Sequence, residues 1–144
     1  MANSRIRVVL VSHGEQSKGM LNTVQMLLGE QDNIAAYCLY PEQSVTDLTE
    51  DLEKEIKEYG AENIIFLTEL KHGSPFNVVV SLTRNYDLYH ITGTNLAMLM
   101  TVILERDFDG ADCGKVCDAA LDAAKDSYVD VRKMLEESDE EEDD

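Results

Sequence analysis

A histidine and a carboxylate stand directly after two apolar runs of this chain. His13 follows the run at residues 6–12, and Glu69 follows the run at residues 63–68. A carboxylate that accepts a hydrogen bond from one imidazole nitrogen fixes the tautomer and leaves the other nitrogen free as a nucleophile. If the two runs form neighbouring strands, His13 is predicted to be a nucleophile and Glu69 the group that orients its ring.

Glycines and a helix start lie beside these two residues. Gly14 follows the histidine, and Gly73 precedes Ser74-Pro75, a pair typical of the start of a helix. Free N–H groups at a helix start favour a phosphoryl group, and glycine lets the backbone approach a ligand closely. We therefore expect a phosphoryl group held by backbone groups and the Ser74 hydroxyl, with no metal and no cofactor.

Each residue of this site also has an ordinary structural explanation. A histidine after a strand can be a polar residue at a loop start, Ser74 can be a helix cap alone, and Glu69 can be an exposed strand end. His90, within or at the end of another strand, is interpreted as structural. The local pattern alone leaves the catalytic and the structural interpretations open.

Strands and helices alternate along the chain, which predicts a parallel sheet with helical crossovers. Apolar and β-branched runs predict four strands, near residues 6–12, 34–40, 63–68 and 88–92. Apolar residues at helical spacing predict five helices, which begin near Ser17, Ser44, Ser74, Asn95 and Cys113; the third is expected to run to about Arg84. Because ligands bind beyond the carboxyl ends of parallel strands, the candidate residues are expected at one edge of the sheet.

Composition narrows the class of protein. The 144 residues fit one domain at residues 1–135, followed by an acidic tail at residues 136–144 that we expect to be disordered. The formal charge of −17 argues against nucleic acid and anionic membranes as partners. No apolar run is long enough to span a membrane, and no signal peptide is evident, so we expect a cytoplasmic protein. Three cysteines are interpreted as free thiols.

Four short motifs stand in order along the chain: Val11-Ser12-His13-Gly14, Met26-Leu27-Leu28-Gly29-Glu30, Gly73-Ser74-Pro75-Phe76-Asn77 and Gly93-Thr94-Asn95-Leu96-Ala97-Met98-Leu99. Together they closely resemble the IIA domain of the mannose/fructose/sorbose family of sugar phosphotransferase systems (PTS). The resemblance covers residues 5–107 well and the remainder loosely. Its specificity comes from four motifs in register, since no single motif is specific.

The resemblance implies a fold and a reaction. It implies an α/β fold with a mostly parallel four-stranded sheet in the order 2-1-3-4, flanked by helices, and a homodimer that exchanges a short C-terminal antiparallel strand, here Ser127 to Arg132. It implies that the phosphocarrier protein HPr phosphorylates His13 on Nε2, and that His13 passes the group to the IIB component during sugar uptake. Glu69 matches an aspartate that orients the imidazole, and Ser74 matches a serine that contacts the phosphoryl group. Contact with the membrane is then only indirect, through the permease subunits.

The sequence departs from the family pattern at two positions, and two other functions are considered beside the one that the resemblance implies. Glu69 is one methylene longer than the family's aspartate, and His72 stands where the family usually has glycine; we interpret His72 as a partner-facing loop residue beside the site. One alternative is a phosphodonor or regulatory IIA-like protein of the dihydroxyacetone-kinase type. The other is a non-catalytic binding module in which His13 is structural.

Overall fold

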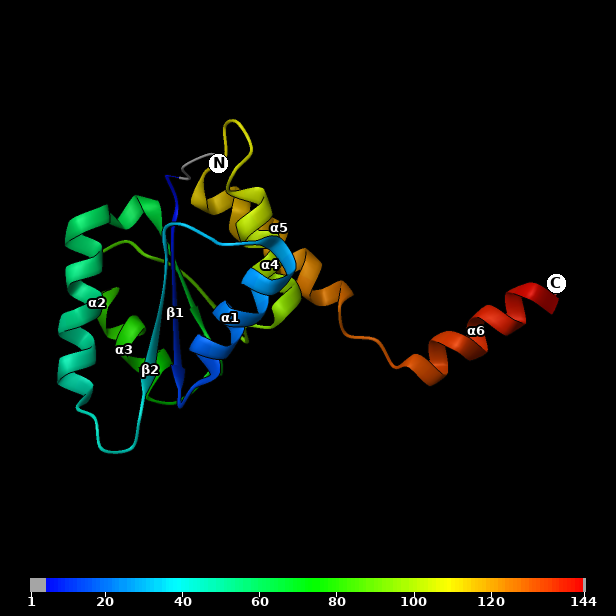
Figure 1. Cartoon of the computed structure of the whole chain (residues 1–144), viewed down its shortest axis with the longest axis horizontal. Helices are drawn as coiled ribbons and strands as arrows, with labels where there is room; N and C mark the ends of the chain where they lie inside the picture. The colour runs from blue at the N-terminus through cyan, green and yellow to red at the C-terminus, as the bar shows by residue number, and fades with distance from the viewer. Residues whose placement is uncertain (1–4, 144) are drawn as a thin grey trace.

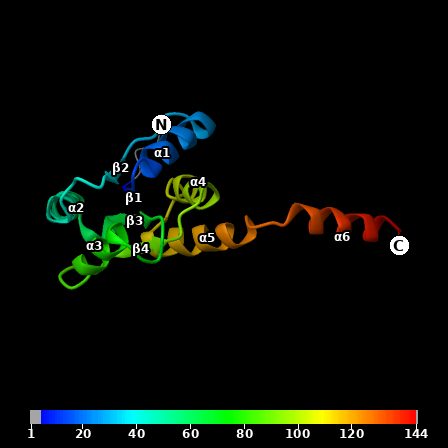
Figure 2. The ribbon, with the colours of Figure 1, turned by 90° about the horizontal axis from the view of Figure 1, so that it is seen from below.

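A central sheet lies between two layers of helices (Figures 1 and 2). The computed structural model describes residues 5–143. The elements in chain order are β1 (Arg7–His13), α1 (Gln16–Leu28), β2 (Ile34–Leu39), α2 (Val45–Tyr59), the 3-10 helix η1 (Ala61–Asn63), β3 (Ile64–Thr68), α3 (Ser74–Leu82), β4 (Tyr89–Thr92), α4 (Leu96–Glu105), α5 (Cys113–Asp126) and α6 (Val131–Asp143).

All four strands are parallel and lie in the predicted order, β2-β1-β3-β4. β1 and β3 occupy the centre because their runs are apolar on both faces, and residues 8–11 and 64–67 are all buried. Since the strands are parallel, their carboxyl ends share one edge of the sheet. His13 ends β1 at this edge, and Glu69 directly follows β3 there.

Different helices cover the two faces of the sheet. On one face Val24 of α1, Leu99 of α4 and Ala120 of α5 belong to one buried apolar cluster. On the other face Leu52 of α2 and Val79 of α3 belong to a second cluster. This arrangement gives the sheet a core on each side, as expected for strand–helix–strand connections. Within residues 5–143, each helix is too short or too polar to cross a membrane.

Several predicted helix starts and helix ends are confirmed. The Ser44 side chain accepts hydrogen bonds from backbone N–H groups in the first turn of α2, and the Asn95 side chain caps α4 in the same way. Gly29 and Gly60 end α1 and α2 with positive φ angles of 87° and 90°. Glycine adopts these angles without the steric penalty that other residues incur.

The exact boundaries of two helices differ from the prediction by one or two residues. α1 begins at Gln16, one residue before Ser17, because the chain already turns at Gly14 with φ +54°. α3 begins at Ser74 itself, since Gly73 occupies the cap position with φ +103° and leaves the serine inside the helix. α3 also ends at Leu82 rather than near Arg84, because the next residues form a tighter turn with hydrogen bonds to backbone carbonyls three residues back.

The segment predicted as an exchanged strand forms no strand here. Ser127 caps the end of α5, residues 128–130 have no regular structure, and Arg132 already lies in α6. Figure 1 shows the chain leading away from the sheet after α5, so this segment does not reach the edge of its own sheet. Among residues 5–143, no strand follows β4.

Residues 136–143 of the acidic tail form part of helix α6; residue 144 lies outside the described residues. Glutamate, lysine, arginine, methionine and leucine, which make up much of this helix, all favour helical structure. The Asp130 side chain caps α6 by accepting from the Lys133 N–H at 3.2 Å, and Arg132 pairs with Glu136 one turn later at 3.3 Å. α6 projects from the body of the molecule (Figures 1 and 2).

Candidate functional site

His13 is the last residue of β1, at the carboxyl edge of the sheet. Its neighbours along the sheet are β2, where Leu39 is its register partner, and β3. The backbone N–H of Gly14 donates to the Leu39 carbonyl at 2.9 Å, which extends the strand pairing past the histidine. The His13 side chain is 48% exposed, so the ring is held by the strand yet open to a partner.

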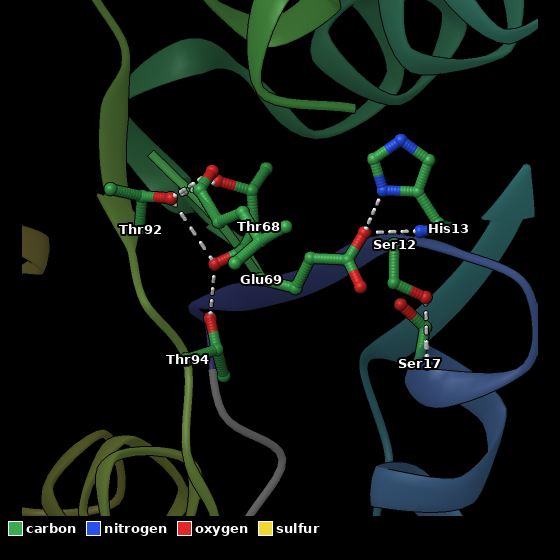
Figure 3. Close-up of polar contacts among 8 residues, drawn as sticks. Ser12, His13, Ser17, Thr68, Glu69, Thr92 and Thr94 are labelled. Atoms are coloured by element: carbon green, nitrogen blue, oxygen red, sulfur yellow. Dashed lines mark hydrogen bonds and ion pairs between the residues drawn. The ribbon is translucent and has the colours of Figure 1, made fainter. Parts of the chain in front are cut away.

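Glu69 holds His13 at two points. The carboxylate oxygen Oε1 of Glu69 accepts a hydrogen bond from the His13 backbone N–H and also pairs with ring atom Nδ1. Figure 3 shows the second ring nitrogen, Nε2, on the side of the ring away from Glu69. The carboxylate side chain is only 12% exposed. The pair therefore selects the Nδ1–H tautomer and leaves the Nε2 lone pair free.

Gly73 lies directly against the imidazole. A Cβ atom at this position would lie 2.8 Å from Cε1 of His13 and 3.3 Å from Nε2. Its φ of +103° is also unfavourable for residues with side chains. Two independent reasons, the backbone angle and the close approach to His13, thus require glycine here.

Ser74 and His72 flank Gly73 without bonding to His13. Ser74 is half-buried and begins α3, whose first N–H groups have no acceptor within the helix. His72 is exposed, and its ring lies edge-on to Phe76 with the ring centroids 6.2 Å apart. Within the described chain, neither side chain has a hydrogen bond or ion pair to the His13 ring.

Two serines join the end of β1 to the start of α1. The Ser12 hydroxyl oxygen accepts from the Ser17 backbone N–H at 2.8 Å, and both residues are buried (Figure 3). This contact fixes the turn at residues 13–16. The turn therefore presents His13 from a rigid strand–helix junction.

A row of polar side chains beside the site was missed by the sequence reasoning. Thr68 at the end of β3 is fully buried, and its hydroxyl lies 2.8 Å from Nε2 of His90 and 2.9 Å from the Thr92 hydroxyl. The Thr92 hydroxyl in turn donates to the backbone carbonyl of Leu70 at 2.7 Å. The signal in the sequence is two polar residues at alternate positions of β4, His90 and Thr92, with Thr68 at the end of β3 as the register partner of Thr92.

His90 belongs to this row and not to the exposed site. Burial lowers the pKa of His90 to about 4, so its ring is neutral near pH 7. Phe76 of α3 packs against it, with the ring centroids 5.4 Å apart. The interpretation of His90 as a structural residue is compatible with this position, although its hydrogen bond leads toward the loop that carries Glu69.

The geometry combines an exposed imidazole nitrogen, a carboxylate fixed on the opposite ring nitrogen and a helix start beside the ring. Such a constellation suits transfer of a group onto Nε2. Residues 7–121 match the family model described as the PTS system fructose IIA component. This chain belongs to that family.

Relatives extend the comparison. The mannose-specific EIIAB component of Escherichia coli K12 is 30% identical over 106 residues, which make up 72% of this chain and 33% of that protein. The chain therefore spans about a third of the length of this relative. The sorbose-specific EIIA component of Klebsiella pneumoniae is 26% identical over 99 residues, 68% of this chain and 73% of the relative.

A solved structure agrees with most of the fold. The crystal structure of phosphotransferase system component EIIA from Streptococcus agalactiae matches with a TM-score of 0.80 and 26% sequence identity, covering 89% of this chain and 98% of that one. The four-stranded parallel sheet with helices on both faces is thus the architecture of a PTS EIIA protein.

Proposed function

We propose that this chain is a cytoplasmic phosphoryl carrier of a mannose-family sugar PTS. HPr donates the phosphoryl group to His13, and the IIB component receives it during sugar uptake. The observation that carries the proposal is the double contact of Glu69 with His13, which leaves Nε2 as the one nucleophilic ring nitrogen. Family membership of residues 7–121 supports it. The membrane is reached only through the permease subunits.

The transfer needs no further reactant. The Nε2 lone pair of His13 forms a bond to phosphorus while the P–N bond to the donor histidine breaks, and the donor nitrogen keeps that electron pair. The proton on Nδ1 stays in place, so the phosphorylated ring carries positive charge, which the Glu69 carboxylate stabilises. Transfer to IIB reverses these steps with the IIB histidine as nucleophile.

The groups around Gly73 would hold the transferred phosphoryl oxygens. The backbone at Gly73 reaches the ring edge next to Nε2, and α3 starts immediately after it. Free N–H groups and the helix dipole at this start favour negative charge. We expect the Ser74 hydroxyl to donate a further hydrogen bond, while Gly14, with φ +54°, lets the chain turn directly after the histidine.

A labelling experiment tests the proposal. The chain is incubated with labelled phosphoenolpyruvate, the first PTS enzyme and HPr, and label on His13 is identified by peptide mapping. His13→Ala should abolish labelling, whereas His72→Ala, the matched control on the neighbouring loop, should keep it. Normal labelling of His13→Ala would reject the proposal. If the label passed to a dihydroxyacetone-kinase partner rather than to IIB, the regulatory alternative would be favoured. If the wild-type chain took up no label at all, the non-catalytic binding module would be favoured.

A homodimer formed through the C-terminal segment is part of the proposal. β4 is an edge strand with one side unpaired in this chain. Five apolar residues after α5 are exposed by 47% or more: Tyr128, Val129, Val131, Met134 and Leu135. Such a run is costly in water and suited to a second copy. Pairing of residues 127–132 with β4 of the partner requires the first turn of α6 to unwind.

A further inference from the structure

We propose that Thr92 is a positioning residue that holds the loop of residues 69–73 against His13 through the Leu70 carbonyl. The proposal deepens the phosphoryl-carrier function above, on which its kinetic part rests. It starts from the polar row of Thr68, His90 and Thr92, which has no contact with His13 itself. Figure 3 shows the two threonines on the far side of Glu69 from the His13 ring.

The loop of residues 69–73 approaches His13 at two points, and one side-chain hydrogen bond from Thr92 holds its backbone. Glu69 at its start pairs with His13, and Gly73 at its end lies against the ring. Leu70 between them is 60% exposed, so burial of its side chain does not fix the loop. Among the described residues, the Thr92 hydroxyl makes the one side-chain hydrogen bond to the backbone of residues 69–72, at 2.7 Å.

Each hydroxyl of the Thr68–His90–Thr92 row donates to the next group toward Leu70, so the donor and acceptor of every hydrogen bond are fixed. A threonine hydroxyl has one hydrogen, and that of Thr92 goes to the Leu70 carbonyl at 2.7 Å because the Thr68 carbonyl is 3.5 Å away. The Thr68 hydrogen then goes to the Thr92 oxygen at 2.9 Å. His90 must therefore donate from Nε2 to Thr68 at 2.8 Å.

The root of the loop is also fixed. The Thr68 carbonyl accepts from both the backbone N–H of Thr94, at 3.1 Å, and its hydroxyl, at 2.8 Å. With Thr68 fully buried, the strand end just before Glu69 cannot shift without breaking these bonds. The row thus ties the loop that carries the Glu69 carboxylate to the strands β3 and β4. The hydrogen bonds of the site also assign opposite tautomers to two histidines: Nδ1–H on His13 and Nε2–H on His90.

The test reads both tautomers by long-range proton–nitrogen NMR of the imidazoles in the whole unphosphorylated chain. The wild-type protein should show Nδ1–H on His13 and Nε2–H on His90. Thr92→Val should abolish the Nδ1–H preference of His13 and slow its phosphorylation by HPr about tenfold, the cost of losing the hydrogen bond that anchors the Leu70 carbonyl. Thr92→Ser, which keeps the hydroxyl, should restore both.

Thr101→Val is the matched control, because Thr101 also donates to a backbone carbonyl, at 2.9 Å, but in α4. It should leave the His13 tautomer and the rate unchanged. Unchanged His13 signals and rate in Thr92→Val would overturn the proposal, as would Nδ1–H on His90 in the wild-type protein. A tautomer shift in Thr92→Val in a protein that HPr does not phosphorylate would support the positioning role and reject the carrier function.

Discussion

At the scale of single residues, the chemistry depends on how closely the backbone approaches the imidazole. Oε1 of Glu69 pairs with Nδ1 of the His13 ring, and the Gly73 backbone approaches so closely that an added Cβ would lie 2.8 Å from Cε1. One contact is electrostatic and the other steric. The ring therefore has little freedom to rotate, and its remaining nitrogen faces outward.

The steric contact gives a prediction for Gly73→Ala. The new methyl group would sit 2.8 Å from Cε1 of His13, so the ring or the loop must move, and the rate of His13 phosphorylation should fall about 100-fold. Gly110→Ala is the control, because Gly110 has a similar φ of +78° with no atom near the added Cβ. Both variants should lose about 1 kcal/mol of stability in urea unfolding. Equal phosphorylation rates in the two variants would contradict a steric role for Gly73.

The sequence allowed the central pair to be predicted but not its surroundings. His13 and Glu69 were inferred from two strand ends that share an edge, because parallel topology alone brings such residues together. The Thr68–His90–Thr92 row depends on which face each side chain takes and on hydroxyl directions, which no sequence pattern specifies. Ser74 had been predicted as a cap, but the φ of Gly73 places it inside α3.

At the scale of elements, a buried ion pair attaches α2 to the sheet at the amino end of β1. Arg7 donates two hydrogen bonds of 2.9 Å to Glu55, and the Tyr37 hydroxyl donates a third at 2.6 Å. Arg7 also stacks on the Tyr59 ring, 4.3 Å from its centroid. Burial raises the pKa of Glu55, but the hydrogen bonds from Arg7 and Tyr37 outweigh it, so the net pKa is lowered.

This pair gives a pH-dependent prediction. Because the folded pKa of Glu55 lies below its unfolded value, its contribution to stability is full above about pH 5 and is lost as the pH falls through the folded pKa. Glu55→Ala removes the carboxylate that pairs with Arg7 and Tyr37 and should cost about 3 kcal/mol at pH 7, measured by urea unfolding, with a smaller loss at low pH. Glu53→Ala on the same helix, where the carboxylate is 36% exposed, should cost under 1 kcal/mol. Equal costs for the two variants would contradict the prediction.

Element boundaries show where sequence reasoning ends. Ser44 and Asn95 were predicted as helix starts and are caps, because their side chains reach N–H groups within the same turn. The C-terminal segment follows no such local rule. A strand at residues 127–132 would take its hydrogen bonds from another chain, and a single copy instead shows helix α6 from Val131.

At the scale of the whole molecule, the charge of −17 is unevenly placed. Eight carboxylates lie at residues 136–144, beyond the proposed dimer segment. Like charges on two such tails repel each other, and salt screens this repulsion. A dimer that exchanges residues 127–132 must therefore overcome the repulsion between its two acidic tails.

Because the acidic tail lies beyond the proposed dimer segment, changes in the two segments should have different effects. Removal of residues 136–144 should leave the dimer intact and leave the melting temperature within about 2 °C, since the side chains of residues 136–142 are all exposed. Val129→Asp, which places a charge in the proposed interface at a residue 52% exposed in the single chain, should give a monomer without loss of folding. Light scattering with size-exclusion chromatography measures both. A dimer in Val129→Asp would exclude the proposed interface.

The arrangement around His13 also constrains the order of events in a sugar PTS. Glu69 occupies Nδ1, so the ring offers one nucleophilic nitrogen, and a phosphoryl group must approach along the Nε2 lone pair. In the proposed relay, donor and recipient must each place a histidine on that same line, and the two cannot be bound there together. The carrier must release one protein before it meets the next, which is the signature of ping-pong kinetics with competition between HPr and IIB for one docking position.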